Sequence, residues 1–237
     1  MLLSLALLVG IWTGPVATFG GPNAPEATEA ATPPPKRFNF ADIRRRAEAL
    51  ASQPFQATSN NLPDLLKNLD YDQYRDIRFR AERSLWRAEG LPFEIQFAPL
   101  GFLFFEPVAI NVVVEGESKA VEYASDLFDY GKNPAPENLP KDLGFAGLKV
   151  LYPLHADSHY DEVAVFLGAS YFRAVGQKQN YGLSVRGLAV DTGLPKQEEF
   201  PRFREFWLEK PAKDAIELTV YALMDSKSLT GAYRFAI

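Results

Sequence analysis

Short runs of alternating apolar and polar residues, separated by turn-forming residues, are the feature that most constrains how this chain can fold. Residues 93–97 place Phe, Ile and Phe at alternate positions with Glu and Gln between them. A period of two puts successive side chains on opposite faces of a strand, so this run predicts a strand with one buried face. Residues 108–114 are mostly β-branched, which is typical of a strand buried on both faces.

The same signals recur along the rest of the chain. Further strands are predicted at residues 77–80, 120–123, 148–152, 162–167, 171–175, 183–190, 205–209, 216–224 and 231–237. Turn-forming residues separate these short runs, as in the Asp-Thr-Gly-Leu-Pro sequence at 191–195. The pattern favours a mainly β fold, an antiparallel β-sandwich.

Two short helices are predicted before the strands. Asn39 can cap a helix whose apolar residues at positions 40, 43, 47, 50 and 51 keep helical spacing. Arg44 and Glu48 can pair one turn apart on its polar face. A second helix is predicted after Pro63, with leucines at 62, 65, 66 and 69. We expect both helices to cover a sheet.

The N-terminal residues predict export from the cytoplasm. Residues 2–12 are almost wholly apolar, a length typical of the core of a signal peptide and short for a membrane span. We place the signal peptide at residues 1–19, with cleavage between there and residue 31. No Lys or Arg precedes Lys36, so a start upstream of Met1 and an uncleaved anchor are the alternatives. Residues 20–37, rich in Pro, Ala and Thr, are predicted to form a linker.

Composition argues against several classes of function. The net charge is -5, and the arginines are interleaved with acids, so the chain lacks the clustered basic surface that nucleic acids require. The absence of cysteine excludes disulfides and thiolate metal sites. No phosphate-binding or dinucleotide motif is present, and we expect no cofactor. His155, Asp157 and His159 have a spacing that could hold a metal ion, but a solvated loop is the expected structure there.

Residues 168–207 combine aromatic side chains, arginines and carboxylates with several glycines. Aromatic faces stack on the apolar faces of sugar rings, and charged groups bind sugar hydroxyls, so this stretch predicts a carbohydrate site. The residues predicted to line it are Tyr171, Arg173, Tyr181, Arg186 and Trp207. Because side chains alternate along a strand, Phe172 is expected in the core. The alternative is an ordinary β-rich core with its charges facing water.

Asp191 is the candidate catalytic residue. It is predicted to lie where a strand ends in a glycine-containing turn, a position from which a loop can present a side chain to a cleft. Hydrolysis of a glycosidic bond with inversion requires an acid and a base about 6.5 to 9.5 Å apart. Glu198, Glu199 and Glu205 follow Asp191 in the sequence, and surface roles are the alternative for all four acids.

Several segments resemble the periplasmic glucan biosynthesis proteins G and D, the OpgG/OpgD (MdoG/MdoD) family. The longest is DEVAVFLGASYFRA at residues 161–174. The others are YGLS at 181–184, EFPRF at 199–203, PLGFLF at 99–104, DLFDYGKN at 126–133, DLGFAG at 142–147 and TGAYRF at 230–235. These segments are spread over most of the chain, so the resemblance is specific.

The resemblance implies both a fold and a function. Family members combine an N-terminal sandwich of the galactose-mutarotase type with a C-terminal immunoglobulin-like domain and are longer than this chain. Residues 38–237 are therefore expected to form a glucan-binding β-sandwich that is incomplete at its C-terminus. Some members are inverting endo-β-1,2-glucanases whose essential acid lies in the half absent here, so this fragment is expected to be inactive alone.

The expected function is binding of β-1,2-glucan in the periplasm during synthesis of osmoregulated periplasmic glucans. The full-length protein is expected to cleave that glucan. The alternative is a non-catalytic accessory that binds glucan beside a membrane glucosyltransferase. A structural envelope sandwich unrelated to sugar is a further alternative.

Overall fold

The computed structural model describes residues 37–58, 62–134, 139–156, 159–180 and 182–237. The chain divides into two compact units, Met1–Pro35 and Lys36–Ile237, and the described residues all belong to the second. The predicted signal peptide and nearly all of the predicted linker lie outside them. Within the described ranges, no helix is long and apolar enough to cross a membrane.

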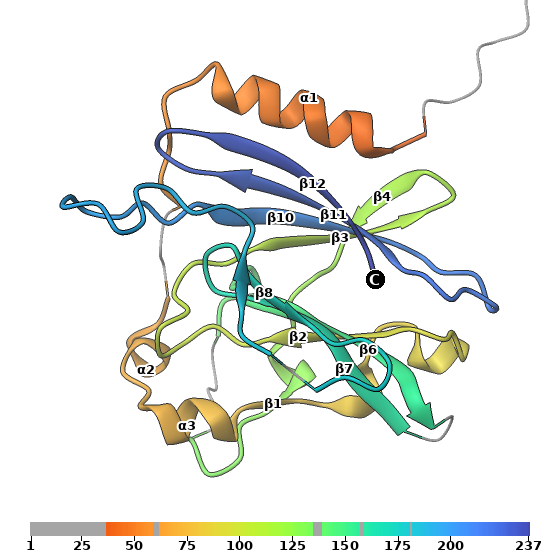
Figure 1. Cartoon of the computed structure of the whole chain (residues 1–237). Coiled ribbons are helices and arrows are strands. Elements are labelled where there is room, and N and C mark those ends of the chain that lie inside the picture. The colour runs from red at the N-terminus through yellow and green to blue at the C-terminus, as the bar shows by residue number, and fades with distance from the viewer. Residues whose placement is uncertain (1–36, 59–61, 135–138, 157–158, 181) are drawn as a thin grey trace, which may run out of the picture. The chain divides into compact units, whose positions relative to one another are not determined.

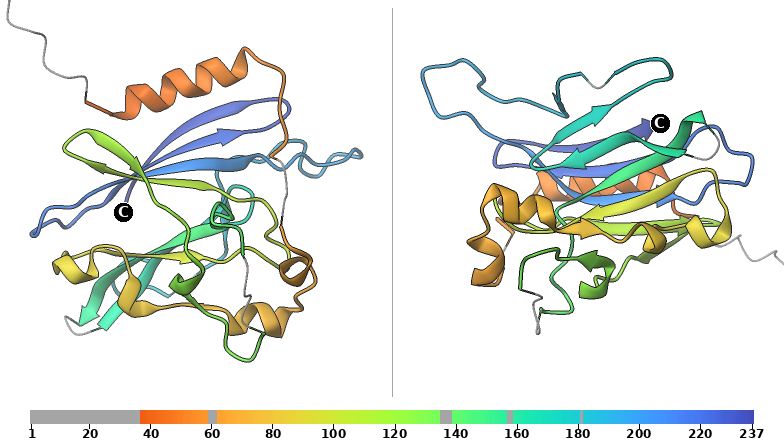
Figure 2. Two further views of the ribbon diagram at one scale, coloured as in Figure 1. Left: turned by 180° about the vertical axis from the view of Figure 1, so that it is seen from behind. Right: turned by 90° about the horizontal axis from the view of Figure 1, so that it is seen from below.

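Two five-stranded sheets form the body of the Lys36–Ile237 unit (Figures 1 and 2). The first sheet has the order β12 (Thr230–Ala236), β11 (Thr219–Asp225), β10 (Arg202–Glu209), β3 (Ala109–Val114) and β4 (Glu117–Ala120). The second has the order β2 (Glu94–Ala98), β6 (Gly147–Ala156), β7 (His159–Leu167), β8 (Tyr171–Ala174) and β9 (Val185–Arg186). The predicted β-sandwich is thereby confirmed. The pairing is antiparallel except between β3 and β10, which run parallel.

Aromatic side chains fill the space between the two sheets. The ring of Phe166 on β7 lies 5.4 Å from that of Phe206 on β10 and 4.9 Å from that of Phe235 on β12. Phe172 on β8 packs against the same cluster, 5.7 Å from Phe166, as the alternation of the strand predicts. Full burial of one such side chain contributes about 1.5–3 kcal/mol, so this cluster holds the sheets together.

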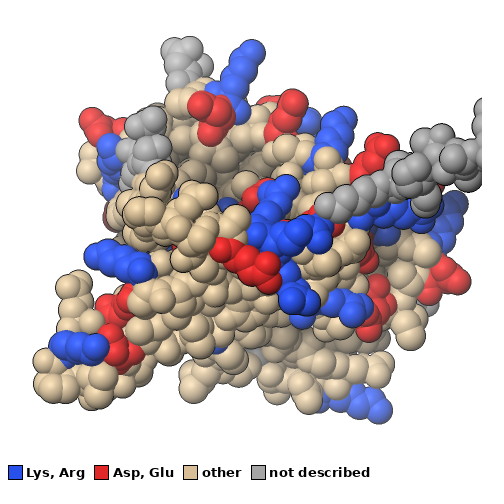
Figure 3. Space-filling view, turned by 90° about the horizontal axis from the view of Figure 1, so that it is seen from above, with Lys and Arg blue, Asp and Glu red and all other residues tan. Residues whose placement is uncertain are grey.

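Helix α1 (Phe40–Ala51) covers the outer face of the first sheet (Figure 1). The Asn39 side chain accepts a hydrogen bond from the Ala41 N–H at 2.9 Å and caps the helix, as predicted. Arg44 and Glu48 pair at 3.9 Å. Seen from the α1 side, basic and acidic side chains are intermixed on the surface (Figure 3).

A helix follows Pro63, as predicted, but it is shorter than the spacing of the leucines suggests, and a further short helix comes after it. Helix α2 (Asp64–Lys67) ends after one turn, and α3 (Tyr71–Asp76) begins at a new cap. The Asp70 carboxylate accepts from the Gln73 N–H at 2.8 Å, and the Gln73 side chain accepts from the Asp70 N–H at 2.9 Å. This capping box starts a second helix only a few residues after the first.

The predicted strand at 120–123 is also wrong, because a tight hairpin shifts the pairing earlier. Glu115 and Gly116 have φ values of 52° and 86°, the left-handed pair that a two-residue hairpin requires. This turn pairs Val114 with Glu117, so β4 begins at Glu117, and the strand ends at Ala120. The strand predicted at 77–80 is reduced to β1 (Arg78–Phe79), which pairs with β5 (Phe128–Asp129). Single 3₁₀ turns lie at Ala81–Arg83, Arg87–Glu89 and Ser125–Leu127.

The strand predicted at 183–190 is reduced to β9, and a long loop follows it. The loop, residues 187–201, leaves the second sheet and returns to the first at β10 (Figure 1). Within it, Val190 and Glu199 pair across a short antiparallel bridge. The loop therefore connects the two sheets at the edge where β8 and β9 lie.

Candidate functional site

Three adjoining surface pockets lie where this loop and β8 meet the start of β10. The first, of about 350 Å³, is lined by Phe55, the acids Asp191, Glu198, Glu199 and Asp225, and by Gln197, Phe200, Arg202, Ser226 and Lys227. The second, about 400 Å³, shares Phe200 and Arg202 with the first. The third, about 170 Å³, shares Phe104, Leu167 and Tyr171 with the second. We call this row of pockets the groove.

Aromatic side chains are spread along the groove. Phe200 is 49% exposed and lies at the junction of the first and second pockets, and Phe55 is exposed in the first. Tyr171 is half-buried at the junction of the second and third. Each of these rings has an apolar face of the kind that stacks on a sugar.

Arg186 lies between two of these aromatic rings. Its guanidinium carbon is 5.7 Å from the ring centre of Tyr171 and 5.4 Å from that of Phe200, within the range of a cation–π contact. Its Nη1 lies 2.5 Å from Glu198 Oε1, and its Nη2 donates to Thr192 Oγ1 at 3.1 Å. The close Nη1 contact is an ion pair that lacks the alignment of a hydrogen bond.

Two carboxylates of the first pocket are held in their ionised form. The hydrogen bond from the Thr192 hydroxyl, at 2.8 Å, and the ion pair with Arg186 lower the pKa of Glu198. The Ser226 hydroxyl lowers the pKa of Glu199 most strongly, and the Ser228 N–H and hydroxyl, at 3.0 and 2.8 Å, add to that effect. A general acid for glycoside hydrolysis needs a raised pKa, so neither glutamate suits that role.

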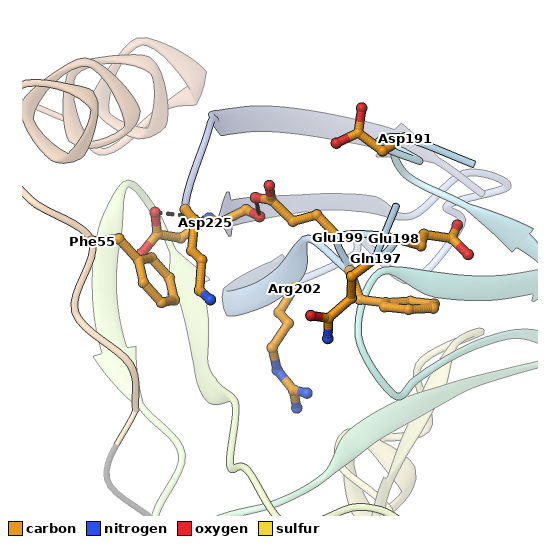
Figure 4. Close-up of a pocket in the computed structure, with 10 residues that line it drawn as sticks. Phe55, Asp191, Gln197, Glu198, Glu199, Arg202 and Asp225 are labelled. Carbon is orange, nitrogen blue, oxygen red and sulfur yellow. Dashed lines mark hydrogen bonds between the residues drawn. The ribbon is translucent and has the colours of Figure 1, made fainter. Parts of the chain in front are cut away.

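Asp191 lies in a strained turn at the edge of the first pocket (Figure 4). Its φ of 60° is in the left-handed region, which Asp adopts more readily than most residues. Its carboxylate pairs with Lys196 Nζ at 2.8 Å. The predicted turn is present, and the side chain lines the pocket from a loop.

Two arginines of β10, Arg202 and Arg204, lie in or beside the groove. Arg202 lies between the first and second pockets, and its side chain extends away from Asp191 (Figure 4). Its Nε pairs with Glu106 Oε2 at 3.0 Å, and burial lowers its pKa. Arg204 pairs with Asp225 at 3.0 Å and donates to the Gln56 carbonyl at 3.0 Å, which holds the segment that carries Phe55.

The residues predicted to bind sugar do not all lie in the groove. Tyr171 and Arg173 line the third pocket, and Arg186 supports the aromatic rings. Tyr181 lies outside the described residues. Trp207 does not fit the prediction that it lines the groove, because it is 0% exposed and packs 5.5 Å from Phe38 at the junction with α1. Side chains alternate along β10, so Phe206 faces the core between the sheets and Trp207 faces the helix.

The residues predicted to bind sugar did not include Phe55, Phe104, Phe200 and Arg202, which also line the groove. Phe104 ends the PLGFLF segment and Phe200 and Arg202 fall in EFPRF, so the segments of family resemblance were the available signal. Phe55 precedes the second helical region and has no comparable signal. The hydrogen bond from Arg204 to Gln56 is what brings its segment to the groove.

The two histidines flank one carboxylate in the hairpin of β6 and β7. His155 Nδ1 lies 3.0 Å from Asp161 Oδ2, and His159 Nε2 lies 3.6 Å from Asp161 Oδ1. The hydrogen bond with His155 lowers the pKa of Asp161. Asp157 lies outside the described residues. Within the described part of the chain, no group of three or more His, Asp and Glu side chains is arranged to hold a metal ion.

The fold and the groove define a two-sheet β-sandwich protein with an aromatic and charged surface site. The chain belongs to the family described as periplasmic glucan biosynthesis protein, MdoG, whose model matches residues 38–237. The family resemblance found in the sequence is confirmed.

Relatives named glucans biosynthesis protein G are similar to this chain. The protein from Rhodopseudomonas palustris (strain BisA53) is 49% identical over 216 residues, which cover 91% of this chain and 43% of the relative. Those from Ralstonia nicotianae and Dickeya dadantii are 49% and 46% identical, and each match covers 84% of this chain. This chain spans 40% and 38% of those two relatives.

Proposed function

We propose that this chain is a β-glucan-binding part of a periplasmic protein of glucan biosynthesis. The family description and the names of the relatives support the pathway and the compartment. The observation that carries the binding role is the row of three adjoining pockets with Phe55, Phe200 and Tyr171 placed along it.

The shape of the groove supports a chain of several sugars as the ligand. Adjoining pockets that share lining residues allow consecutive sugar units to occupy neighbouring positions. Aromatic rings at separate points along the row supply a stacking surface for more than one unit, and Arg173 and Arg202 supply donors for hydroxyl groups. β-1,2-linked glucan is the ligand that the family resemblance implies.

Cleavage of the glucan is the second candidate function, and it belongs to the longer protein. Asp191 lines the groove from a loop and is the residue of this chain proposed to take part. Glu198 and Glu199 have lowered pKa values, which favours binding over proton donation in the part of the groove described here. The alternative is a non-catalytic accessory to a membrane glucosyltransferase. Such an accessory would bind glucan in the groove and would not need a catalytic acid.

Binding is tested with purified protein and soluble linear β-1,2-glucan by isothermal titration calorimetry. We expect binding that is roughly tenfold weaker after Phe200→Ala, since one stacking aromatic contributes about 0.5–1.5 kcal/mol in addition to the area that it buries. Leu183→Ala is the matched control, because Leu183 is 95% exposed and does not line the groove. No measurable binding by the wild-type chain would reject the proposal.

Cleavage is tested separately in a longer protein of the family that includes this region. Incubation with linear β-1,2-glucan, followed by counting of reducing ends, is expected to show short products that Asp191→Asn abolishes. An unchanged polymer that still binds the protein would favour the accessory role.

A further inference from the structure

We propose that Arg186 is a positioning residue of the groove. It forms a clasp with Thr192 and Glu198 that holds Phe200 in place, and it does not itself bind the sugar. The effect on affinity rests on the function proposed above, whereas the clasp itself is a property of the free protein.

The surroundings of Arg186 indicate a supporting role. The side chain is 17% exposed, with Tyr171 and Phe200 both within 6 Å of the guanidinium carbon. The two Nη atoms are directed to Glu198 and to Thr192. Because Nη1 is buried against Glu198, Nη2 donates to Thr192 and two rings lie against the guanidinium, little of it is accessible to a hydroxyl-rich ligand.

The Thr192 hydroxyl closes the clasp. It accepts a hydrogen bond from Arg186 and donates one to Glu198 at 2.8 Å. Three side chains from β9 and from both ends of the 191–198 segment are therefore linked in a ring of contacts. Such a ring restrains the loop more than a single exposed ion pair would, because several contacts must break together.

Neighbouring glutamates connect the loop to the two sheets. Glu198 reaches Arg186 on β9 of the second sheet, whereas Glu199 accepts hydrogen bonds from Ser226 and Ser228 in the turn between β11 and β12 of the first sheet. Phe200 is the next residue in the chain. Its position over the groove is therefore set by an anchor on each sheet, and removal of Arg186 takes one of them away.

The expected benefit of the clasp is preorganisation of the binding surface. Phe200 is a half-exposed ring on a loop, and an ordered loop does not lose conformational entropy when the ligand binds. Without the clasp, binding must order the loop and the ring, so affinity falls although no contact with the sugar has been removed.

Hydrogen exchange of the free protein tests the clasp. The Glu199 N–H donates to the Val190 carbonyl at 3.2 Å and reports on the closure of the loop. We expect Arg186→Ala to speed exchange of this amide by roughly tenfold, with no change in the amides of β6. Arg83→Ala, which removes a similar 3.2 Å pair with Asp126 outside the groove, is the control. Unchanged exchange at Glu199 in Arg186→Ala would overturn the clasp.

A double-mutant cycle with linear β-1,2-glucan tests the positioning role. We expect Arg186→Ala to weaken binding by roughly tenfold in the wild-type background and by less than about twofold in Phe200→Ala, because the arginine acts through that ring. Additive effects would mean that Arg186 contacts the sugar and would overturn the proposal. If the wild-type chain does not bind glucan, the proposed function fails, and hydrogen exchange still decides whether the clasp exists.

Discussion

Arg46 of α1 and Glu205 of β10 form an ion pair, with 3.1 Å between Nη1 and Oε2, at the junction of the helix and the first sheet. Glu205 also accepts a hydrogen bond from Asn111 Nδ2 at 2.9 Å, and the Arg46 guanidinium lies 4.9 Å from the ring centre of Trp207. Burial raises the pKa of Glu205 in spite of these partners. The junction therefore holds a carboxylate whose ionised form is disfavoured by burial and supported by Asn111 and Arg46.

Loss of Arg46 is expected to destabilise the protein more at high pH than at low pH. Because the folded pKa of Glu205 is raised, its contribution is present below the unfolded pKa and is lost as the pH rises through the folded pKa. Arg46→Ala raises that pKa further. We expect a loss of about 1–3 kcal/mol at about pH 8 and a smaller loss at about pH 5, measured by urea unfolding.

Arg44→Ala is the control for this prediction. Arg44 belongs to the same helix, but its 3.9 Å pair with Glu48 is exposed, so its removal is expected to cost about 0.5 kcal/mol or less. Equal losses at the two pH values for Arg46→Ala would show that Glu205 does not control the effect.

Trp207→Ala is expected to lower stability without changing the intrinsic affinity for glucan. Removal of a fully buried indole costs about 3–5 kcal/mol, because a cavity remains between the sheet and α1. Urea unfolding measures the loss, and titration under conditions where the variant is folded measures the affinity. Weakened binding by the folded variant would return Trp207 to the set of binding residues.

Glu199 is expected to contribute to the acid sensitivity of the protein. Its folded pKa is lowered, so its contribution is present above the unfolded pKa of about 4.3 and is lost as the pH falls through the folded pKa. Glu199→Gln should cost up to about 1 kcal/mol at neutral pH, and this cost should disappear as the pH falls through the folded pKa of Glu199. Unfolding measured across this pH range tests the prediction, with the exposed Glu48→Gln as the control; a cost that persists in acid contradicts it.

Phe55→Ala is expected to reduce the preference of the groove for long glucan chains. Phe55 lines the first pocket, and Arg173 and Tyr171 line the third, so a short oligosaccharide bound near Tyr171 does not reach Phe55. Titration with β-1,2-glucan of increasing length should show that wild-type affinity rises further with length than that of the variant. An equal loss for short and long chains would argue against binding along the whole row.

Asn39→Ala is expected to cost about 1 kcal/mol, because it removes the cap that satisfies the Ala41 N–H. Asn39→Ser should restore most of this stability, since Ser is also a good N-cap residue. Thermal unfolding of the three proteins provides the measurement. If the serine variant is no more stable than the alanine variant, the cap hydrogen bond is not the cause.

Local signals predicted those elements whose ends are set by neighbouring residues. The start of α1 follows from Asn39, whose side chain bonds to the next turn of the same helix. The register of β3 and β4 depends on the left-handed conformations of Glu115 and Gly116, which the alternation of apolar residues did not reveal. The alternation predicted that strands exist there and left their pairing undetermined.

The β-sandwich class, the first helix and the family could be predicted from the chain alone, because these depend on periodicity, capping and runs of residues along the chain. Tertiary structure alone decided which aromatic residues reach the surface. Trp207 lies within β10 and Phe200 just before it, yet one is buried under α1 and the other lines the groove. Their burial depends on which elements pack against each face of the sheet, and those contacts join residues far apart in the chain.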